Sequence, residues 1–132
     1  MGKIKRYNLQ NHVWKSNRGW GINPFEVIGR LQETLGNVHV ISITPGAVRG
    51  NHLHTNATEW ILIFGGPSLL VWRSSDNDVI NEINIKDDQA ELFEIPPNVE
   101  HAVKNNSNRD IYLISFNDSF DKGTLKANFL LE

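Results

Sequence analysis

Residues 46–66 read GAVRGNHLHTNATEWILIFGG. If the histidine segment is a strand, His52 and His54 point to the same face, because side chains alternate along a strand with a period of two. Glu59 opens the next apolar run, whose alternate residues suit the interior of a β-barrel. We therefore expect two imidazoles and one carboxylate from neighbouring strands to face one another.

A second segment, residues 96–105, reads PPNVEHAVKN. His101 follows a Pro-Pro turn, which aims it back toward the same space. Three nitrogen ligands and one oxygen ligand form a half-shell that leaves positions open for water or substrate. Such a set suits iron, manganese, nickel, copper or zinc better than calcium or magnesium. The predicted ligands of this divalent transition metal are His52, His54, Glu59 and His101.

Short runs rich in Val, Ile, Phe and Trp recur from residue 38 onward, separated by Gly, Pro, Asn and Asp turns. Short strands with short connections and no long helix predict an all-β sandwich or barrel. The expected strands are Val38–Thr44, Glu59–Phe64, Leu69–Arg73, Val79–Lys86, Glu91–Ile95, His101–Lys104 and Asp110–Asn117.

The chain has the length of one domain, because 132 residues are too few for two good cores. We expect residues 38–117 to form the barrel and residues 1–37 to be an N-terminal arm or edge segment of the same domain. Residues 118–132 are expected to be a final strand or an arm. The stretch from Val27 to Leu35 is a candidate short helix, weakened by Gly29.

Composition excludes several classes of function. Thirteen basic and fifteen acidic side chains give a formal net charge of −2. Proteins that bind nucleic acid or an anionic membrane typically carry an excess of basic residues, so this balance does not indicate either kind of binding. The absence of cysteine excludes disulfides, thiolate zinc sites and cysteine nucleophiles. No 18-residue apolar run and no secretory leader is recognisable, so we expect a cytoplasmic protein.

The two histidine segments resemble the two motifs of the cupin superfamily, which are small jelly-roll β-barrels. In the first motif, Gly46, His52, His54, Glu59 and Gly66 match every position. In the second, Pro96, His101 and Asn105 match, whereas Asn98 replaces a glycine; asparagine also tolerates a left-handed backbone. The resemblance implies a single-domain cupin jelly-roll barrel. It does not define the reaction, because one fold hosts many chemistries.

A narrower resemblance concerns Arg49-Gly50-Asn51-His52-x-His54, which is similar to the Arg-Gly-x-His-x-His of cupins that isomerise or epimerise nucleotide-linked keto sugars. Leu53 and Thr55 depart from the alanine and lysine usual in those proteins. Cupin domains attached to sugar-nucleotide reductases in capsule synthesis also carry Arg-Gly-Asn-His-x-His and resemble a metal-binding type. These resemblances imply an isomerase or epimerase in polysaccharide biosynthesis. They make Arg49 the candidate substrate-binding residue, for a carboxylate or phosphate.

Two versions of the chemistry exclude each other. In one, His52 or His54 is the catalytic base that removes a proton next to a carbonyl, near its ordinary pKa of about 6.5. In the other, both histidines hold the metal, and a bound hydroxide or Tyr112 must act as base.

Two further classes of function stay open at this point. The same ligands suit an iron- or manganese-dependent dioxygenase, and the domain can also be a non-catalytic module that binds a sugar or another metabolite. The expected partners are a small-molecule ligand and a second copy in a homodimer, with neither nucleic acid nor membrane. His12 and His39 fit no motif and are expected at the surface or an edge.

Overall fold

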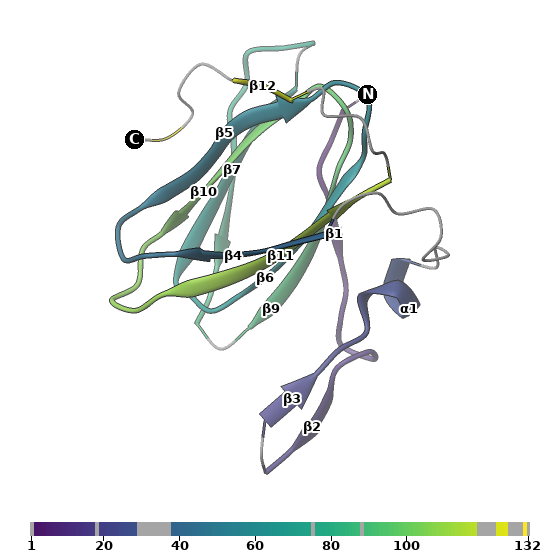
Figure 1. Cartoon of the computed structure of the whole chain (residues 1–132), viewed down its shortest axis with the longest axis vertical. Coiled ribbons are helices and arrows are strands. Elements are labelled where there is room, and N and C mark those ends of the chain that lie inside the picture. The colour runs from purple at the N-terminus through teal and green to yellow at the C-terminus, as the bar shows by residue number, and fades with distance from the viewer. Residues whose placement is uncertain are drawn as a thin grey trace.

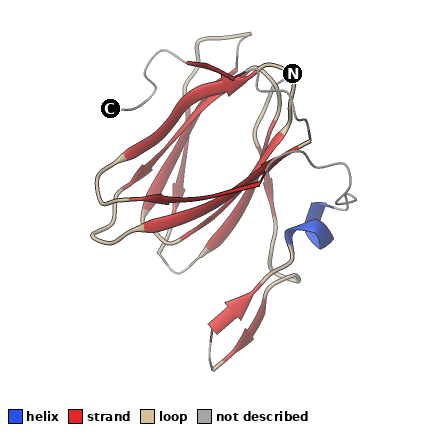
Figure 2. Ribbon diagram, in the orientation of Figure 1, coloured by secondary structure: helices blue, strands red, loops and turns tan. Residues whose placement is uncertain are grey.

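The computed structural model describes residues 2–17, 19–28, 38–74, 76–87, 89–118, 124–126 and 131. Two antiparallel five-stranded sheets face each other and enclose an apolar interior (Figures 1 and 2). The predicted all-β, single-domain cupin jelly roll is confirmed. No helix in the described ranges is long and apolar enough to cross a membrane.

Each sheet combines strands that are distant in the sequence. The first sheet has the order β1 (Lys5–Tyr7), β9 (Ala90–Ile95), β6 (Glu59–Phe64), β11 (Ile111–Asn117) and β4 (Val38–Ile43). The second has the order β12 (Thr124–Lys126), β5 (Val48–His54), β10 (Val99–Asn105), β7 (Ser68–Ser74) and β8 (Asn81–Ile85). Strands β4 and β12 are therefore edge strands, one on each sheet.

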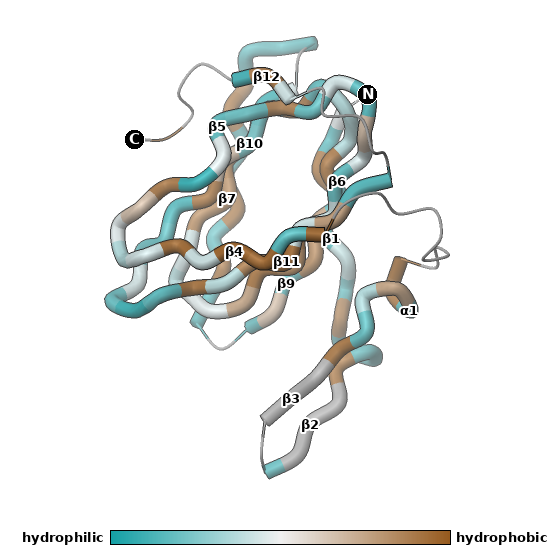
Figure 3. Tube along the Cα trace, viewed as in Figure 1, coloured by the Kyte–Doolittle hydropathy of each residue, from teal (hydrophilic) through white to brown (hydrophobic). Residues whose placement is uncertain are grey.

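The main core lies between the sheets. Alternate residues of the strands point inward, and Figure 3 shows hydrophobic residues in the strands of both sheets. Ile63, Leu70 and Phe93 are completely buried there. They lie in one cluster with Ile43, Ile61, Ile85, Ile95, Val99, Val103, Ile111 and Leu113.

The motif residue Asn105 has a structural role, at the opposite end of β10 from the turn that precedes His101. Its buried amide nitrogen donates to the carbonyl oxygens of Ile43, at 2.8 Å, and Arg109, at 2.7 Å. Its side-chain oxygen accepts the Ser107 amide at 2.8 Å. The side chain thus ties the end of β4 to the turn that follows β10.

The N-terminal segment covers the outer face of the first sheet. A second apolar cluster on that face contains Leu9, Trp60, Leu62, Leu92 and Phe116. Its partly buried members include Phe25 and Ile28 of the helix α1 (Pro24–Ile28). The hairpin formed by β2 (Trp14–Ser16) and β3 (Gly19–Gly21) projects from the barrel (Figure 1).

The helix begins three residues earlier than its predicted start at Val27. Asn23 caps it, because its side-chain oxygen accepts the Phe25 amide at 3.1 Å. Pro24 suits the first helical position, where no amide hydrogen is needed. Residues 29–35 of the predicted helix lie outside the described residues.

Candidate metal centre

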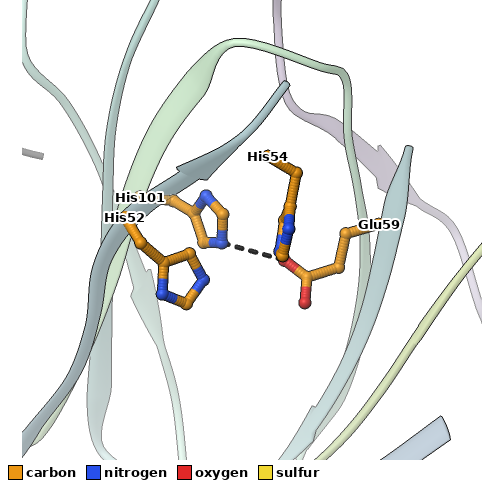
Figure 4. A group of neighbouring side chains, drawn as sticks. All are labelled: His52, His54, Glu59 and His101. Atoms are coloured by element: carbon orange, nitrogen blue, oxygen red, sulfur yellow. Dashed lines mark ion pairs between the residues drawn. The ribbon is translucent and has the colours of Figure 1, made fainter. Parts of the chain in front are cut away.

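Four side chains from three strands meet between the sheets. His52 and His54 come from β5, Glu59 from the start of β6, and His101 from β10. Each offers one ligand atom, and these atoms all lie within 4.8 Å of one another. Figure 4 shows the imidazole rings and the carboxylate converging on one space.

Strand register explains how the residues meet. His101 lies directly opposite His52 on the paired strand, so both rings occupy the same face. The ring centroids of these two histidines are 4.7 Å apart. The turn before β10 is fixed to the end of β5, because the Asn98 amide donates to the His54 carbonyl oxygen at 2.7 Å. Asn98 has a φ of 65°, a left-handed conformation that explains why asparagine can replace the motif glycine.

A β-bulge interrupts β5 beside this pair. His101 pairs with His52, but the next residue, Ala102, pairs with Gly50, so Asn51 is an extra residue on β5. Gly50 and Asn51 have φ values of 103° and 55°. Because side chains alternate between the two faces, one extra residue in a strand moves every side chain before it to the opposite face of the sheet.

The bulge brings Arg49 to the ligand face. Arg49 lies opposite Val103, which is buried in the core between the sheets, so Arg49 is on the same side of the sheet as His52. Residues three apart on a regular strand would point to opposite faces. The Asn51 side chain fixes the bulge by bonding the backbone of Leu131, at 3.0 Å and 3.2 Å. Arg49 is therefore an exposed residue on the same face of the sheet as His52, three residues before it in the sequence.

Substitution of Gly50 by alanine tests the bulge. A Cβ there would lie 2.9 Å from the His101 carbonyl oxygen, in addition to the strain at a φ of +103°. Gly46 is the matched control, because its φ is +77° but no atom lies within 4 Å of its Cβ position. We expect G50A to lose about 1–3 kcal/mol more unfolding free energy than G46A in urea titrations. Equal losses would contradict this account of the bulge.

Neighbouring groups orient the ligand side chains. The His101 Nδ1 donates to the Val99 carbonyl oxygen at 3.0 Å, which leaves the lone pair of Nε2 directed at the site. The His54 Nδ1 lies 3.1 Å from the Thr124 hydroxyl. The Ser115 hydroxyl donates to Oε2 of the Glu59 carboxylate.

Three buried atoms at the centre lack a hydrogen-bond partner in the described part of the chain: Nε2 of His54, Nε2 of His101 and Oε1 of Glu59. The nitrogens approach this oxygen to 3.3 Å and 2.9 Å, without the angles of a hydrogen bond. With Nδ1 of His101 as the donor, Nε2 of the neutral ring and the carboxylate oxygen are both acceptors. A cation between them would satisfy all of these atoms, so the residues present fit a metal ion.

The pKa shifts of His52 and Glu59 favour the protonation states that a metal requires, whereas the shift of His54 opposes them. Burial lowers the pKa of His52 to about 4, with a smaller contribution from the neighbouring His101, so the His52 ring is neutral at pH 7. Burial alone would raise the pKa of Glu59, but its contacts with His101, His54 and Ser115 outweigh this effect and hold the pKa well below its usual range. The Glu59 contact raises the pKa of His54 in spite of burial. A metal at this nitrogen would compete with a proton, so its binding would weaken as the pH falls.

Tyr112 is excluded as the base that the sequence suggested. Its cross-strand partner Phe64 lies on the outer face of β6, and their rings stack with centroids 6.3 Å apart. The Tyr112 side chain is 44% exposed on that face. Side chains alternate along β11: Leu113 and Ser115 point inward, so Tyr112 points outward and cannot act as the base that the sequence suggested.

The family profile for the polysaccharide biosynthesis C-terminal domain matches residues 23–125. The chain belongs to this family. Its members' cupin fold agrees with the predicted resemblance. None of the curated proteins compared with this sequence matches it significantly.

Solved structures add relatives of this domain. It is 28% identical to CapF, a capsular polysaccharide assembling protein from Staphylococcus aureus, with a TM-score of 0.64. The match covers 71% of this chain but only 29% of CapF, so the domain spans less than a third of that protein.

Two smaller proteins share the fold over nearly the whole chain. A dTDP sugar isomerase from Desulfovibrio desulfuricans G20 is 13% identical, with a TM-score of 0.77 and coverage of 95% of this chain and 83% of that one. QdtA, a sugar 3,4-ketoisomerase from Thermoanaerobacterium thermosaccharolyticum, is also 13% identical, with a TM-score of 0.67 and coverage of 97% and 88%. At this identity, the likeness concerns the fold.

Proposed function

We propose that this domain binds one divalent transition metal and isomerises or epimerises a nucleotide-linked keto sugar for polysaccharide synthesis. The observation that carries the proposal is the convergence of three unpartnered buried atoms from His54, Glu59 and His101, beside the neutral ring of His52. Membership of a polysaccharide biosynthesis family supports the pathway. The sugar isomerases that share the fold support the substrate class.

His52, His54, Glu59 and His101 would hold the metal. A bound divalent cation supplies Lewis acidity, which stabilises negative charge on a keto oxygen. The protein residues contribute the remaining functions. Thr124, Ser115 and the Val99 carbonyl orient the ligand side chains, and the buried surroundings limit access of water.

Arg49 is the proposed substrate-binding residue. Arg49 is exposed on the ligand face of the sheet, and its guanidinium has the fork geometry that binds phosphate oxygens in pairs. A nucleotide-linked sugar carries a diphosphate, so Arg49 would bind this group while the sugar lies deeper, toward His52 and His101.

The metal-free version remains the second candidate because of a specific observation. His52 is neutral at pH 7, with its pKa lowered to about 4, and can accept a proton if no metal occupies the centre. The convergence of the unpartnered atoms favours the metal-bound version, in which His52 and His54 are ligands rather than proton shuttles.

Hydrogen exchange at the sugar tests the proposed function. Proton abstraction next to a keto group exchanges that hydrogen with solvent even when no net product accumulates. TDP-4-keto-6-deoxyglucose, which has been crystallised with a QdtA variant, is a suitable probe, together with its UDP counterpart. We expect deuterium from D₂O to enter the sugar ring, as measured by mass spectrometry, and exchange to stop after chelation and resume when metal is restored.

Three outcomes separate the candidates. Exchange that persists fully without metal but is lost in the His52→Gln variant would favour the metal-free version. Saturable binding of the nucleotide sugar without any exchange would indicate a binding module. Metal-dependent oxygen uptake would indicate a dioxygenase. The first of these results would contradict the role of the metal, and the other two would contradict the proposed isomerase.

A further inference from the structure

The proposed metal centre leaves the reaction without a proton-transfer residue. If His52, His54, Glu59 and His101 all bind the metal, none has a free lone pair for the substrate. Tyr112 points to the opposite face of its sheet. With Tyr112 excluded, either a bound hydroxide or a further group that faces the interior must accept the proton.

Strand register identifies the ionisable residues that face the space between the sheets. Directly paired residues of neighbouring strands share a face, so the cross-strand partner of each residue defines whether it faces inward. Beyond the four predicted ligands, the inward-facing ionisable residues of the described strands are Arg6, His39, Arg49, Glu91 and Lys126.

Most of these residues are unsuited to accept the proton that is removed from the substrate. Arg6 and Glu91 form an ion pair with each other near the β1 edge. A guanidinium has no lone pair to accept a proton, which excludes Arg49. Lys126 lies opposite His52 on edge strand β12, and a lysine ammonium is a donor without an acceptor site. His39 is the one residue of this set whose side chain carries both a ring nitrogen lone pair that can accept a proton and a ring N–H that can donate one.

His39 lies next to the centre but too far away to be a ligand. It is directly opposite Ser115 on β11, and the Ser115 hydroxyl donates to Glu59. Ile41 and Ile43 pack on the main core. His39 is on the same face of β4 as these two residues, because side chains alternate along the strand, so His39 also faces inward. Strands lie about 4.8 Å apart, and β4 and β6 flank β11, so the two strands are roughly 10 Å apart. Glu59 is two residues along β6 from Ile61, the residue level with His39, so the backbones of His39 and Glu59 are roughly 12 Å apart. At that separation, His39 would contact a substrate held at the centre and not the metal itself.

The position of His39 also suits proton exchange with water. It is exposed on β4, an edge strand of the first sheet, whereas His101 is only 2% exposed. A proton taken from a substrate can therefore pass to solvent without crossing the core.

We propose that His39 is the catalytic acid–base residue of this site. This inference rests on the proposed function. The C–H bond next to the keto group breaks, its proton moves to an imidazole nitrogen of His39, and its electron pair forms the enolate. In an epimerisation, a proton from water returns to the same carbon from the opposite face. In an isomerisation, the proton returns to the former keto carbon, while the hydroxyl proton of the neighbouring carbon moves to the former keto oxygen. Neither reaction needs an oxidant or reductant.

The test compares His39→Gln with two controls in the deuterium-exchange assay on TDP-4-keto-6-deoxyglucose and its UDP counterpart. His12→Gln makes the same chemical change in the N-terminal segment, and Lys126→Gln removes the other inward-facing candidate. We expect His39→Gln to lower the exchange rate at saturating substrate by about 100-fold or more, with metal content and KM nearly unchanged. Free imidazole should restore part of the exchange in His39→Ala.

The outcomes are distinguishable. Wild-type exchange with an unchanged rate in His39→Gln overturns this assignment and leaves the proposed function intact. The same conclusion follows if Lys126→Gln abolishes exchange and His39→Gln does not, or if His39→Gln loses its metal. A metal-loaded wild-type protein without any exchange overturns the proposed function, and the assignment of His39 with it.

Discussion

Replacement of His101 by alanine is expected to weaken metal binding by at least about a hundredfold. This ring is 2% exposed, its Nδ1 is fixed by the Val99 carbonyl, and its Nε2 points at Glu59. Loss of a supporting residue outside the ligand set typically costs about 10- to 100-fold in metal affinity, and loss of a direct ligand is expected to cost more. Equilibrium dialysis against zinc, with elemental analysis of the retained metal, measures the effect.

His12→Ala is the control for this experiment, since it also removes an imidazole but lies far along the chain from the ligand strands. It should retain wild-type affinity and about one equivalent of metal. Circular dichroism should show that the His101→Ala barrel still folds. A folded His101→Ala protein with wild-type affinity would exclude His101 as a ligand.

Removal of the metal is expected to lower the thermal stability of the wild-type protein strongly. A ligand that binds only the folded state stabilises it by about 4 kcal/mol when its free concentration is about a thousand times its Kd. For a domain of this size, that corresponds to roughly 10–20 °C in Tm. Differential scanning calorimetry with and without a chelator measures the difference.

Glu59→Gln sharpens this second prediction. The substitution preserves side-chain size but removes the negative charge that the metal would neutralise. Its Tm should therefore respond little to chelator or to added metal. A wild-type Tm that is equally insensitive would contradict a structural contribution of the metal, and a full response in Glu59→Gln would show that this carboxylate is not a ligand.

Much of the fold was predictable because short runs rich in β-branched and aromatic residues are separated by Gly, Pro, Asn and Asp turns. Glu59–Phe64 is an example: it is apolar at every position after Glu59, two glycines follow it, and its predicted bounds are those of β6. The convergence of His52, His54, Glu59 and His101 was also predictable, since the two cupin motifs fix their spacing. The roles of these residues in metal binding and catalysis remain predictions, as does the homodimer.

Other features depend on pairings that local sequence does not reveal. The facing of Arg49 depends on the bulge at Asn51, which only the pairing of β5 with β10 defines. His39 has no motif, and its place near Glu59 follows from its register with Ser115 on β11. Short edge strands such as β1 and β12 have too few residues for a recognisable period, so their positions depend on the strands that they join.

The most direct test of the metal centre is a crystal structure of protein purified without an affinity tag, chelator or added metal. Anomalous diffraction would be recorded at the iron, manganese, nickel and zinc absorption edges. The account predicts one anomalous peak about 2.0–2.2 Å from ligand atoms of His52, His54, Glu59 and His101. A well-ordered site without a peak, or a peak bound elsewhere, would contradict it.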